Sequence, residues 1–246
     1  MQERLIIYLM NTMNRCLLIT FLIISISMYG TEQQKCTLYF IRHGETDWNK
    51  EGKLQGHSNI PLNQQGEKQA LKLKGLLHHV NFTAAFSSDL MRACKTAEIV
   101  LSSQPMSIFQ TEALRERCMG IWEGRSMIDL KKNFKEKQSY FDQLSKQEFL
   151  AYTWDDKSES YEDVYKRVKY YVGQHAADHL GSSVLVSTHG GVLRALLYSL
   201  DFKTGQRWQV SNCAYLKVIV DAQGELSLAE SEGIDFVKTE NALIPF

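Results

Sequence analysis

The sequence predicts an α/β fold, a three-layer αβα sandwich whose mainly parallel central sheet has helices on both faces and a helical lid excursion. Short apolar segments, each the length of a buried strand, alternate with segments of helical period. This alternation is typical of a parallel sheet covered by helices. Two of the strands end alike, one in His43-Gly44 and the other in His189-Gly190. Because the carboxyl ends of parallel strands meet at one edge of a sheet, we expect both histidines there.

Length and charge limit the other classes of function. With 246 residues, 44% of them hydrophobic, the chain can bury one sizeable core, which predicts one domain with a leader before it. Lys and Arg number 28, as do Asp and Glu, so the formal net charge is zero. This balance argues against a nucleic-acid partner. The five cysteines are scattered and form no C-x-x-C pair, so neither a disulfide framework nor a metal site is expected.

Residues 1–35 are interpreted as an apolar leader and linker, followed by the folded domain over residues 36–246. Residues 16–29 form an uncharged apolar run, shorter than the ~20 residues of a membrane span and closer to a signal-peptide core. We therefore expect an exported or membrane-anchored protein whose only membrane contact is through this leader. If translation starts at a later methionine, a cytoplasmic protein is expected instead. The sequence does not indicate an oligomeric state.

The first strand is expected over residues 38–41, directly before Arg42 and His43. Residues 47–63 contain Gly, Asn and Pro at short intervals, which predicts an ordered loop. Long loops in compact domains are often functional. Asn63 is a suitable N-cap for an amphipathic helix over residues 66–79.

A second βα unit follows this helix. A short strand is expected over residues 84–86, and a helix over residues 90–101. Ser88 or Asp89 is expected to cap that helix, because short polar side chains accept hydrogen bonds from the first free N–H groups. Another strand is expected over residues 107–110.

Residues 126–152 are charged, helical in propensity and weakly periodic, and we interpret them as a helical excursion over the site, a lid. A clear amphipathic helix is predicted over residues 159–180. Within it, His175 and His179 lie four residues apart but lack the H-E-x-x-H pattern of a zinc site, so they are interpreted as part of a solvated helix face.

The last part of the chain contains a strongly apolar strand over residues 184–188, which leads into His189. A helix is expected over residues 192–200. Two final strands, over residues 214–220 and 226–230, are expected to pair across a turn that contains Gly224.

These elements bring cationic side chains to the same edge of the sheet. Arg42 precedes the first histidine, and Arg92 lies in the first turn of a helix that begins at that edge. A guanidinium matches the oxygens of a phosphate, and a helix N-terminus favours an anion. Together with His43 and His189, these arginines predict a pocket for a phosphoryl group.

The chain resembles the histidine phosphatase (phosphoglycerate mutase-like) superfamily over residues 37–219. The resemblance rests on five sequence blocks in the family's order, namely Arg42-His43-Gly44-Glu45-Thr46 with Asn49, residues 87–97 around Arg92, residues 114–124 around Glu116, residues 159–167, and residues 187–191 around His189. One departure is Ser158, where the family commonly has a glycine, and it makes the geometry of that loop less certain than the chemistry.

The resemblance implies a role for each matching residue. Catalytic roles fall to His43, Glu116 and His189, and substrate contacts to Arg42, Asn49, Arg92, Gln55, Gly56 and Gly190. His43 would be the nucleophile that forms a phosphohistidine, and the arginines with His189 would hold the phosphoryl oxygens. Gln55 and Gly56 are equally well explained as plain loop residues.

Glu116 would protonate the leaving oxygen and then activate water, which is ordinary acid–base catalysis by a carboxyl group. Two alternatives stay open for this position: a salt bridge from Glu116 to Arg115 or Arg117, and Glu123 as the acid. No metal or cofactor is implied, because the arginines supply the charge.

The favoured function is hydrolysis of a small phosphorylated metabolite. Mutases of the family carry a long basic insertion with paired arginines after the third block, whereas residues 126–152 are short and contain lysines without an arginine pair. Gly120-x-Trp122-Glu123-Gly124 also resembles the phosphatase branch. The alternatives are a phosphoglycerate mutase that interconverts 2- and 3-phosphoglycerate, and a catalytically degenerate phosphate-binding protein.

Overall fold

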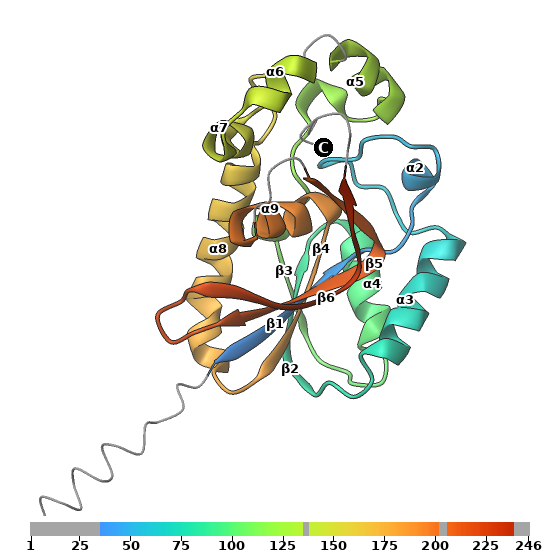
Figure 1. Cartoon of the computed structure of the whole chain (residues 1–246). Helices are drawn as coiled ribbons and strands as arrows, with labels where there is room; N and C mark the ends of the chain where they lie inside the picture. The colour runs from blue at the N-terminus through green and yellow to red at the C-terminus, as the bar shows by residue number, and fades with distance from the viewer. Residues whose placement is uncertain (1–34, 135–137, 202–205, 239–246) are drawn as a thin grey trace, which may run out of the picture. The chain divides into compact units, whose positions relative to one another are not determined.

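A six-stranded sheet forms the centre of the computed structural model, which describes residues 35–134, 138–201 and 206–238. Its strands are β1 (Cys36–Arg42), β2 (Phe82–Ser88), β3 (Ile108–Thr111), β4 (Ser183–Thr188), β5 (Gln206–Val220) and β6 (Leu226–Lys238). They lie in the order β3-β2-β4-β1-β5-β6 (Figure 1). The predicted leader lies outside the described residues, and no helix among those described is long and apolar enough to cross a membrane.

The strands that carry the predicted site are parallel neighbours. β4 pairs in parallel with β1 and with β2, and β2 pairs in parallel with β3. β5 is antiparallel to β1, and β6 is antiparallel to β5. The prediction of a mainly parallel sheet is confirmed. Arg42 pairs with Thr188 at the end of the β1–β4 ladder, so the next residues, His43 and His189, leave the sheet side by side.

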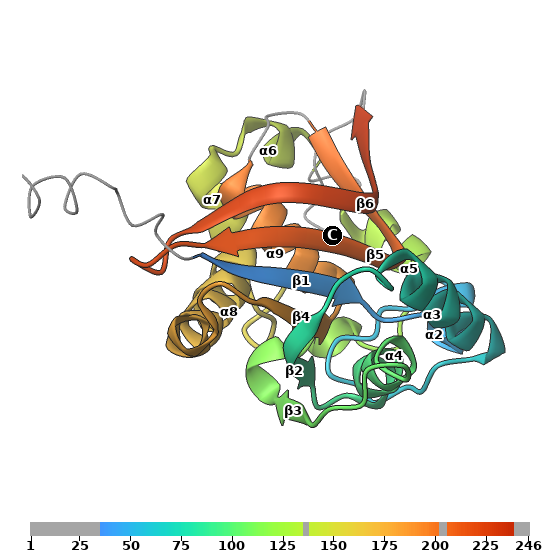
Figure 2. The same ribbon diagram turned by 90° about the horizontal axis from the view of Figure 1, so that it is seen from below.

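Helices cover both faces of the sheet (Figures 1 and 2). On one face, α3 (Gln64–Leu76) and α4 (Met91–Val100) pack against Tyr39 and Ile41 of β1. On the other face, α8 (Tyr161–Ala176) and α9 (Gly190–Leu200) pack against Leu38 and Phe40. Successive side chains of a strand point to opposite faces, so β1 contributes to both core clusters and reads as one continuous apolar run.

Residues 126–152 form the expected helical excursion. Its helices are α5 (Met127–Phe134), α6 (Gln138–Gln143) and α7 (Lys146–Ala151). A separate apolar cluster lies beneath α5 and α6, and it consists of Leu54, Met119, Trp122, Leu130, Phe141 and Trp154. This cluster joins the excursion to the loop after β1, where the sequence predicted an ordered segment. That loop begins with the short helix α2 (Asp47–Lys50).

The expected N-cap of α3 is confirmed, whereas that of α4 is wrong. The side chain of Asn63 accepts a hydrogen bond from the amide of Gly66. The N-cap position of α4 is Leu90, which has no side-chain cap. Instead the amide of Met91 donates to Oδ1 of Asn59 at 2.8 Å. Asp89 is unavailable as a cap because it pairs with a distant arginine.

The interpretation of His175 and His179 as a solvated face is also wrong. Both are half-buried, and their rings lie 5.0 Å and 6.1 Å from the ring of Phe86. Phe86 belongs to β2, so its contact with the end of α8 depends on the tertiary fold. The histidines therefore pack as partly apolar side chains and lie away from the predicted site.

Two leucines of α3 give a matched test of this core. Leu73 is 1% exposed and Leu71 is 56% exposed on the same helix. Leu73→Ala is expected to lower the free energy of unfolding by about 2–5 kcal/mol, because it leaves a cavity in the core. Leu71→Ala should cost less than about 1 kcal/mol. Urea denaturation followed by circular dichroism measures both, and equal losses would contradict the packing described.

Candidate active site

His43 follows β1 and is held with one ring nitrogen free. Its side chain is 1% exposed, and Nδ1 lies 2.7 Å from the carbonyl oxygen of Gly44. A carbonyl oxygen only accepts, so Nδ1 carries the proton and Nε2 keeps a lone pair. Gly44 is required here, because a Cβ at its position would lie 2.4 Å from the carbonyl oxygen of Gly66. His43 thus has the neutral ring and the lone pair that the predicted nucleophile requires.

His189 lies opposite His43 with the other tautomer. The two ring centroids are 5.2 Å apart. Nε of Arg92 donates to Nδ1 of His189 at 3.2 Å, so the proton of the His189 ring is on Nε2. That Nε2 is buried and has no hydrogen-bond partner in the described part of the chain. A buried donor without an acceptor indicates a place for a ligand oxygen.

Burial lowers the pKa of both histidines. The pKa of His43 and that of His189 fall well below the ordinary value, first because burial disfavours the charged ring and second because the positive charge of Arg92 is close. Both rings are therefore neutral at physiological pH. For His43 this preserves the lone pair that a nucleophile needs.

Arg92 is fully buried and is held by the loop that follows β1. Its Nη1 donates to the carbonyl oxygen of Ser58 at 2.7 Å, and its Nη2 donates to that of Gly56 at 2.8 Å. Gly56 therefore acts through its backbone on the arginine. The sequence predicted a substrate contact at Gly56, and the structure gives it this indirect place.

Arg42 has an orphaned donor beside the same site. Its Nη1 donates to the carbonyl oxygen of Val210, while its buried Nε has no partner among the described residues. Burial lowers the pKa of Arg42 and of Arg92 to about 10, so both remain charged at neutral pH. Neither arginine forms an ion pair within the described ranges. The carboxylates of Glu116 and Glu123 act on these buried cations through space without an ion pair, and a phosphoryl dianion would offset more of the cost of burying them.

Glu116 belongs to the third sequence block, and its carboxylate contacts the first turn of α9. The amide of Gly191 donates to its two carboxylate oxygens at 2.9 Å and 3.2 Å, and the amide of Arg117 donates at 2.7 Å. Its backbone carbonyl accepts from His57 and from Arg167. No ion pair of Glu116 is found among residues 35–134, 138–201 and 206–238. The alternative of a salt bridge to Arg115 or Arg117 is therefore wrong.

Glu123, the competing acid, has a different place. Its carboxylate accepts from the amide of His57, the hydroxyl of Ser58 and the amide of Met119. Gly56 makes room for it, since a Cβ there would lie 2.0 Å from Oε1 of Glu123 and the residue has φ of +51°. Glu123 thus shapes the loop whose carbonyls hold the buried arginine.

Asn49 is fixed through its oxygen. Oδ1 accepts from the amide of Thr46, which caps α2, and from Nδ2 of Asn212, each at 3.2 Å. With Oδ1 occupied, the Nδ2 hydrogens of Asn49, which have no acceptor among the described residues, are the donors that the expected contact with a ligand would use. Asn212 also donates to the carbonyl oxygen of His43 at 3.1 Å. The sequence gave no signal for Asn212, which lies where β5 departs from regular pairing.

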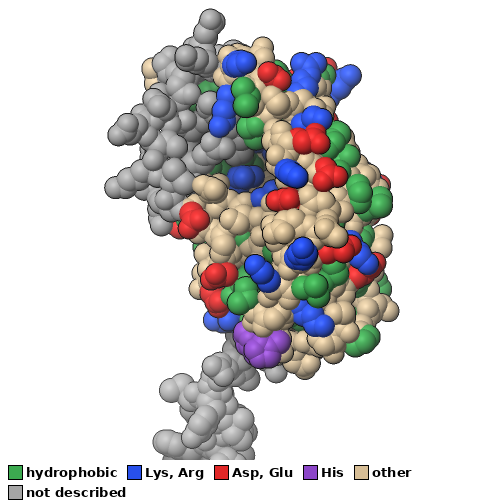
Figure 3. All heavy atoms as spheres, turned by 90° about the vertical axis from the view of Figure 1, so that its right-hand side faces the viewer, with side chains coloured by type: hydrophobic (Ala, Val, Ile, Leu, Met, Phe, Trp, Pro, Cys, Tyr) green, Lys and Arg blue, Asp and Glu red, His purple; other side chains and the backbone are tan. Residues whose placement is uncertain are grey.

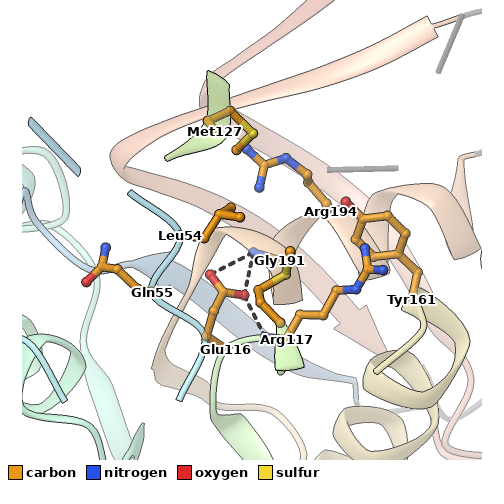
Figure 4. A pocket seen from close by; sticks show the side chains of 9 residues that line it. Leu54, Gln55, Glu116, Arg117, Met127, Tyr161, Gly191 and Arg194 are labelled. Carbon is orange, nitrogen blue, oxygen red and sulfur yellow. Dashed lines mark hydrogen bonds between the residues drawn. The ribbon is translucent and has the colours of Figure 1, made fainter. Parts of the chain in front are cut away.

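A cavity of about 90 Å³ lies beside Glu116 (Figure 4). Its lining consists of Leu54, Gln55, Glu116, Arg117, Met119, Met127, Tyr161, Gly191 and Arg194. Of the predicted residues, Glu116 and Gln55 line it, and Oε1 of Gln55 is buried without a partner among the described residues. His43, Arg42, Arg92, His189 and Asn49 do not line it.

Gly190 lies next to Arg42 and next to Arg194, and Arg194 lines the cavity. A Cβ at Gly190 would lie 3.2 Å from Nε of Arg42 and 3.3 Å from Nη1 of Arg194. On the face of the molecule shown in Figure 3, basic side chains gather around a recess. The sequence did not single out Arg194, Met127 or Tyr161. Arg194 could have been suspected, because it lies one helical turn after Gly190.

Metal ligands do not gather anywhere in the described residues. No group of three or more His, Cys, Asp or Glu side chains there is arranged to hold a metal ion. The positive charges beside His43 and His189 are those of Arg42 and Arg92.

Comparisons with known proteins identify a family that matches most of the chain. Residues 38–230 match the histidine phosphatase superfamily (branch 1). A probable phosphoglycerate mutase, GpmB of Escherichia coli O1:K1, is 29% identical over 216 residues, which cover 80% of this chain and 97% of that protein.

Two solved structures are also similar. A phosphoglycerate mutase from Bacillus anthracis is 28% identical with a TM-score of 0.67, over 82% of this chain and 95% of the other. A putative alpha-ribazole-5'-P phosphatase from Escherichia coli is 27% identical with a TM-score of 0.62, over 79% and 94%.

The two histidine tautomers can be tested by nuclear magnetic resonance. At about pH 6, below the ordinary histidine pKa of about 6.5, both rings are expected to be neutral, with the proton of His43 on Nδ1 and that of His189 on Nε2. Long-range ¹⁵N–¹H spectra of the imidazoles measure this, and a doubly protonated His43 would contradict it. The unfolded chain takes up these protons as the pH falls through about 6.5, so the free energy of unfolding should fall there.

Proposed function

This chain belongs to the histidine phosphatase superfamily, branch 1, and we propose that it is a phosphomonoester hydrolase that acts through a phosphohistidine on a small phosphorylated metabolite. One observation carries the proposal. The free Nε2 of His43 lies in a site with two buried arginines that have no ion-pair partner among the described residues. A neutral nucleophile next to positive charge that no ion pair neutralises suits attack on a phosphoryl dianion.

In the first step, Nε2 of His43 attacks phosphorus and the bond to the leaving oxygen breaks. The proton stays on Nδ1 and is donated to the carbonyl oxygen of Gly44, and this hydrogen bond stabilises the positive charge that develops on the ring. Arg42, Arg92 and Nε2–H of His189 donate to the non-bridging oxygens. Glu116 gives a proton to the leaving oxygen, and its place on the cavity wall supports that role.

In the second step, water attacks the phosphohistidine. Glu116, now a carboxylate, accepts a proton from the water, which restores the carboxylic acid while inorganic phosphate leaves. His43 regains its lone pair. Amides of Gly191 and Arg117 keep the carboxylate in place between the two steps. A fixed carboxyl group of this kind is typically worth about 10²–10⁴ in rate.

Hydrolysis is favoured over a mutase reaction by what surrounds the cavity. A mutase must retain a doubly phosphorylated intermediate, which needs a second strongly cationic site and exclusion of water. Arg117 and Arg194 line the cavity, but the described residues of the helical excursion add no cation to them: the excursion contributes Met127, whereas its Lys131 and Lys132 are exposed. The mutase remains the second candidate, because the similar proteins include a probable and a named phosphoglycerate mutase.

The same site supports catalysis without a metal. Arg42 and Arg92 place two permanent charges where a metal ion would otherwise neutralise the phosphoryl group. We therefore propose that activity persists in the presence of a chelator.

His43→Ala is expected to lower the hydrolysis of p-nitrophenyl phosphate by at least about 10³-fold, because the covalent route is lost. Activity is measured with excess EDTA throughout. His78→Ala is the matched control, since His78 is an exposed histidine in the turn that follows α3. Equal activity of the two variants would contradict the assignment of the nucleophile.

The same preparation separates hydrolase from mutase. With 3-phosphoglycerate as substrate, ³¹P spectra should show inorganic phosphate as the product. Accumulation of 2-phosphoglycerate at a constant total of phosphate ester would instead support the mutase.

A further inference from the structure

Strand β5 carries a bulge where it pairs with β6. The regular register of β5 with β6 stops after Val210 and resumes at Tyr215, and residues 211–214 of β5 lie opposite Gly233 of β6. Extra residues on one strand bend it locally, and such bulges often redirect a side chain next to an active site. Residues 211–214 are called the β5 bulge below.

The β5 bulge is held in a strained conformation. Cys213 has φ of +59° and is the one residue other than glycine with a positive φ in the part of the chain that the structure describes. A residue with a Cβ is disfavoured in this left-handed region, and such strain persists only where surrounding contacts require it. Gly233 leaves room for the bulge, since a Cβ there would lie 3.1 Å from Cβ of Ala214. Both strands thus keep this irregular shape despite its cost in free energy.

The bulge directs the side chain of Asn212 toward two residues of the site. Nδ2 of Asn212 donates to the carbonyl oxygen of His43 at 3.1 Å and to Oδ1 of Asn49 at 3.2 Å. A carboxamide nitrogen carries two hydrogens, one for each of these acceptors. The amide of Cys213 donates to the same carbonyl of His43 at 3.3 Å. His43 therefore has two donors from the bulge, whereas Asn212 is the one described residue of β5 that donates to Asn49.

The orientation of the Asn49 carboxamide depends on these donors. Its Oδ1 accepts from the amide of Thr46 as well as from Nδ2 of Asn212. Rotated by half a turn, the carboxamide would place its own N–H groups against these two N–H donors and lose both bonds. Thr46 is a local partner, because it belongs to the capping box of α2. Asn212 is the partner that reaches Asn49 across the fold.

We propose that Asn212 is a positioning residue for phosphoryl binding, which fixes the carboxamide of Asn49 so that Nδ2 of Asn49 donates to a phosphoryl oxygen. The inference rests on the proposed function, because it takes the ligand beside His43 to be a phosphoryl group. Asn212 acts through Asn49 and not on the phosphoryl group itself, since both of its Nδ2 hydrogens are used within the protein. A donor that is already oriented needs no reorganisation when the anion binds.

Binding of inorganic phosphate to the full chain tests this role without turnover. Asn49→Ala is expected to weaken phosphate binding about 10- to 100-fold, the value of a hydrogen bond to a charged group. Asn212→Ala should weaken it about 3- to 10-fold, because Asn49 then loses one of the two N–H donors that orient it. In a protein that already carries Asn49→Ala, Asn212→Ala should change the affinity less than about 2-fold, because the two residues act as one unit. Calorimetric titration measures the dissociation constant of each protein.

Ser211→Ala is the matched control from the same bulge. Ser211 is exposed and its side chain makes no hydrogen bond to a described residue, so phosphate binding should stay as in the unaltered protein. The amide of Cys213 still holds the carbonyl of His43 in every one of these variants. Circular dichroism verifies that each variant is folded. The proposal is overturned if Asn212→Ala weakens binding equally with and without Asn49, or if Ser211→Ala weakens it as much as Asn212→Ala does.

A measurement on the unaltered protein decides the matter even if Asn212→Ala does not fold. In ¹⁵N–¹H spectra, the side-chain N–H resonances of Asn49 are expected to shift when phosphate is added, because one hydrogen gains a charged acceptor. The side-chain resonances of Asn212 should shift less. Larger shifts at Asn212 than at Asn49 would make Asn212 a direct ligand and would overturn its role as a positioning residue.

Phosphate binding also separates this inference from the proposed function. If the effects of the two substitutions are coupled and the unaltered protein releases no phosphate from any ester, the positioning role stands and the hydrolase assignment fails. If phosphate is released but the two effects simply add, the hydrolase assignment stands and the positioning role fails.

Discussion

The parallel pairing of β1 with β4 is the constraint on which the site depends. Arg42 pairs with Thr188, and the amide of His43 donates to the carbonyl oxygen of Thr188 at 3.0 Å. This bond carries the ladder one residue past the strand and fixes the backbone of His43 against the strand that leads into His189. A slip of one residue would turn each histidine to the opposite face. The apolar side chains on both faces of β1 therefore also determine where His43 lies relative to His189.

Positive charge is buried here at a cost that other contacts offset. Gly56 and Ser58 supply carbonyl oxygens to Arg92, and Glu123 in turn holds their loop. Burial alone would raise the pKa of Glu159, but its hydrogen bonds and charge pairing with Arg167 outweigh burial and lower it. That pair fixes the backbone behind Glu116. The loops are thus organised to keep the cations in place before a substrate arrives, which is the preorganisation that phosphoryl transfer requires.

The sequence was sufficient for the parts of the site that follow from local pattern. Strand ends predicted His43 and His189, and a helix start predicted Arg92, because each depends on the period of its own element. Contacts between segments that are distant in the chain could not be predicted from the sequence. Asn59 caps α4 from the loop after β1, and Asn212 reaches His43 from an irregular part of β5. Asn212 and the packing of His175 on Phe86 could be found only once the strands and helices were in place, whereas Arg194 could have been suspected from its position one helical turn after Gly190.

The central claim, that His43 carries the phosphoryl group, is tested most directly by trapping the intermediate. Enzyme mixed with p-nitrophenyl phosphate is quenched in alkali within milliseconds, digested, and analysed by mass spectrometry. The account predicts a phosphoryl group on Nε2 of His43, stable in alkali and lost in acid, which disappears as substrate is exhausted. Phosphorylation at another residue, or turnover with His43 unmodified at every time point, would contradict it.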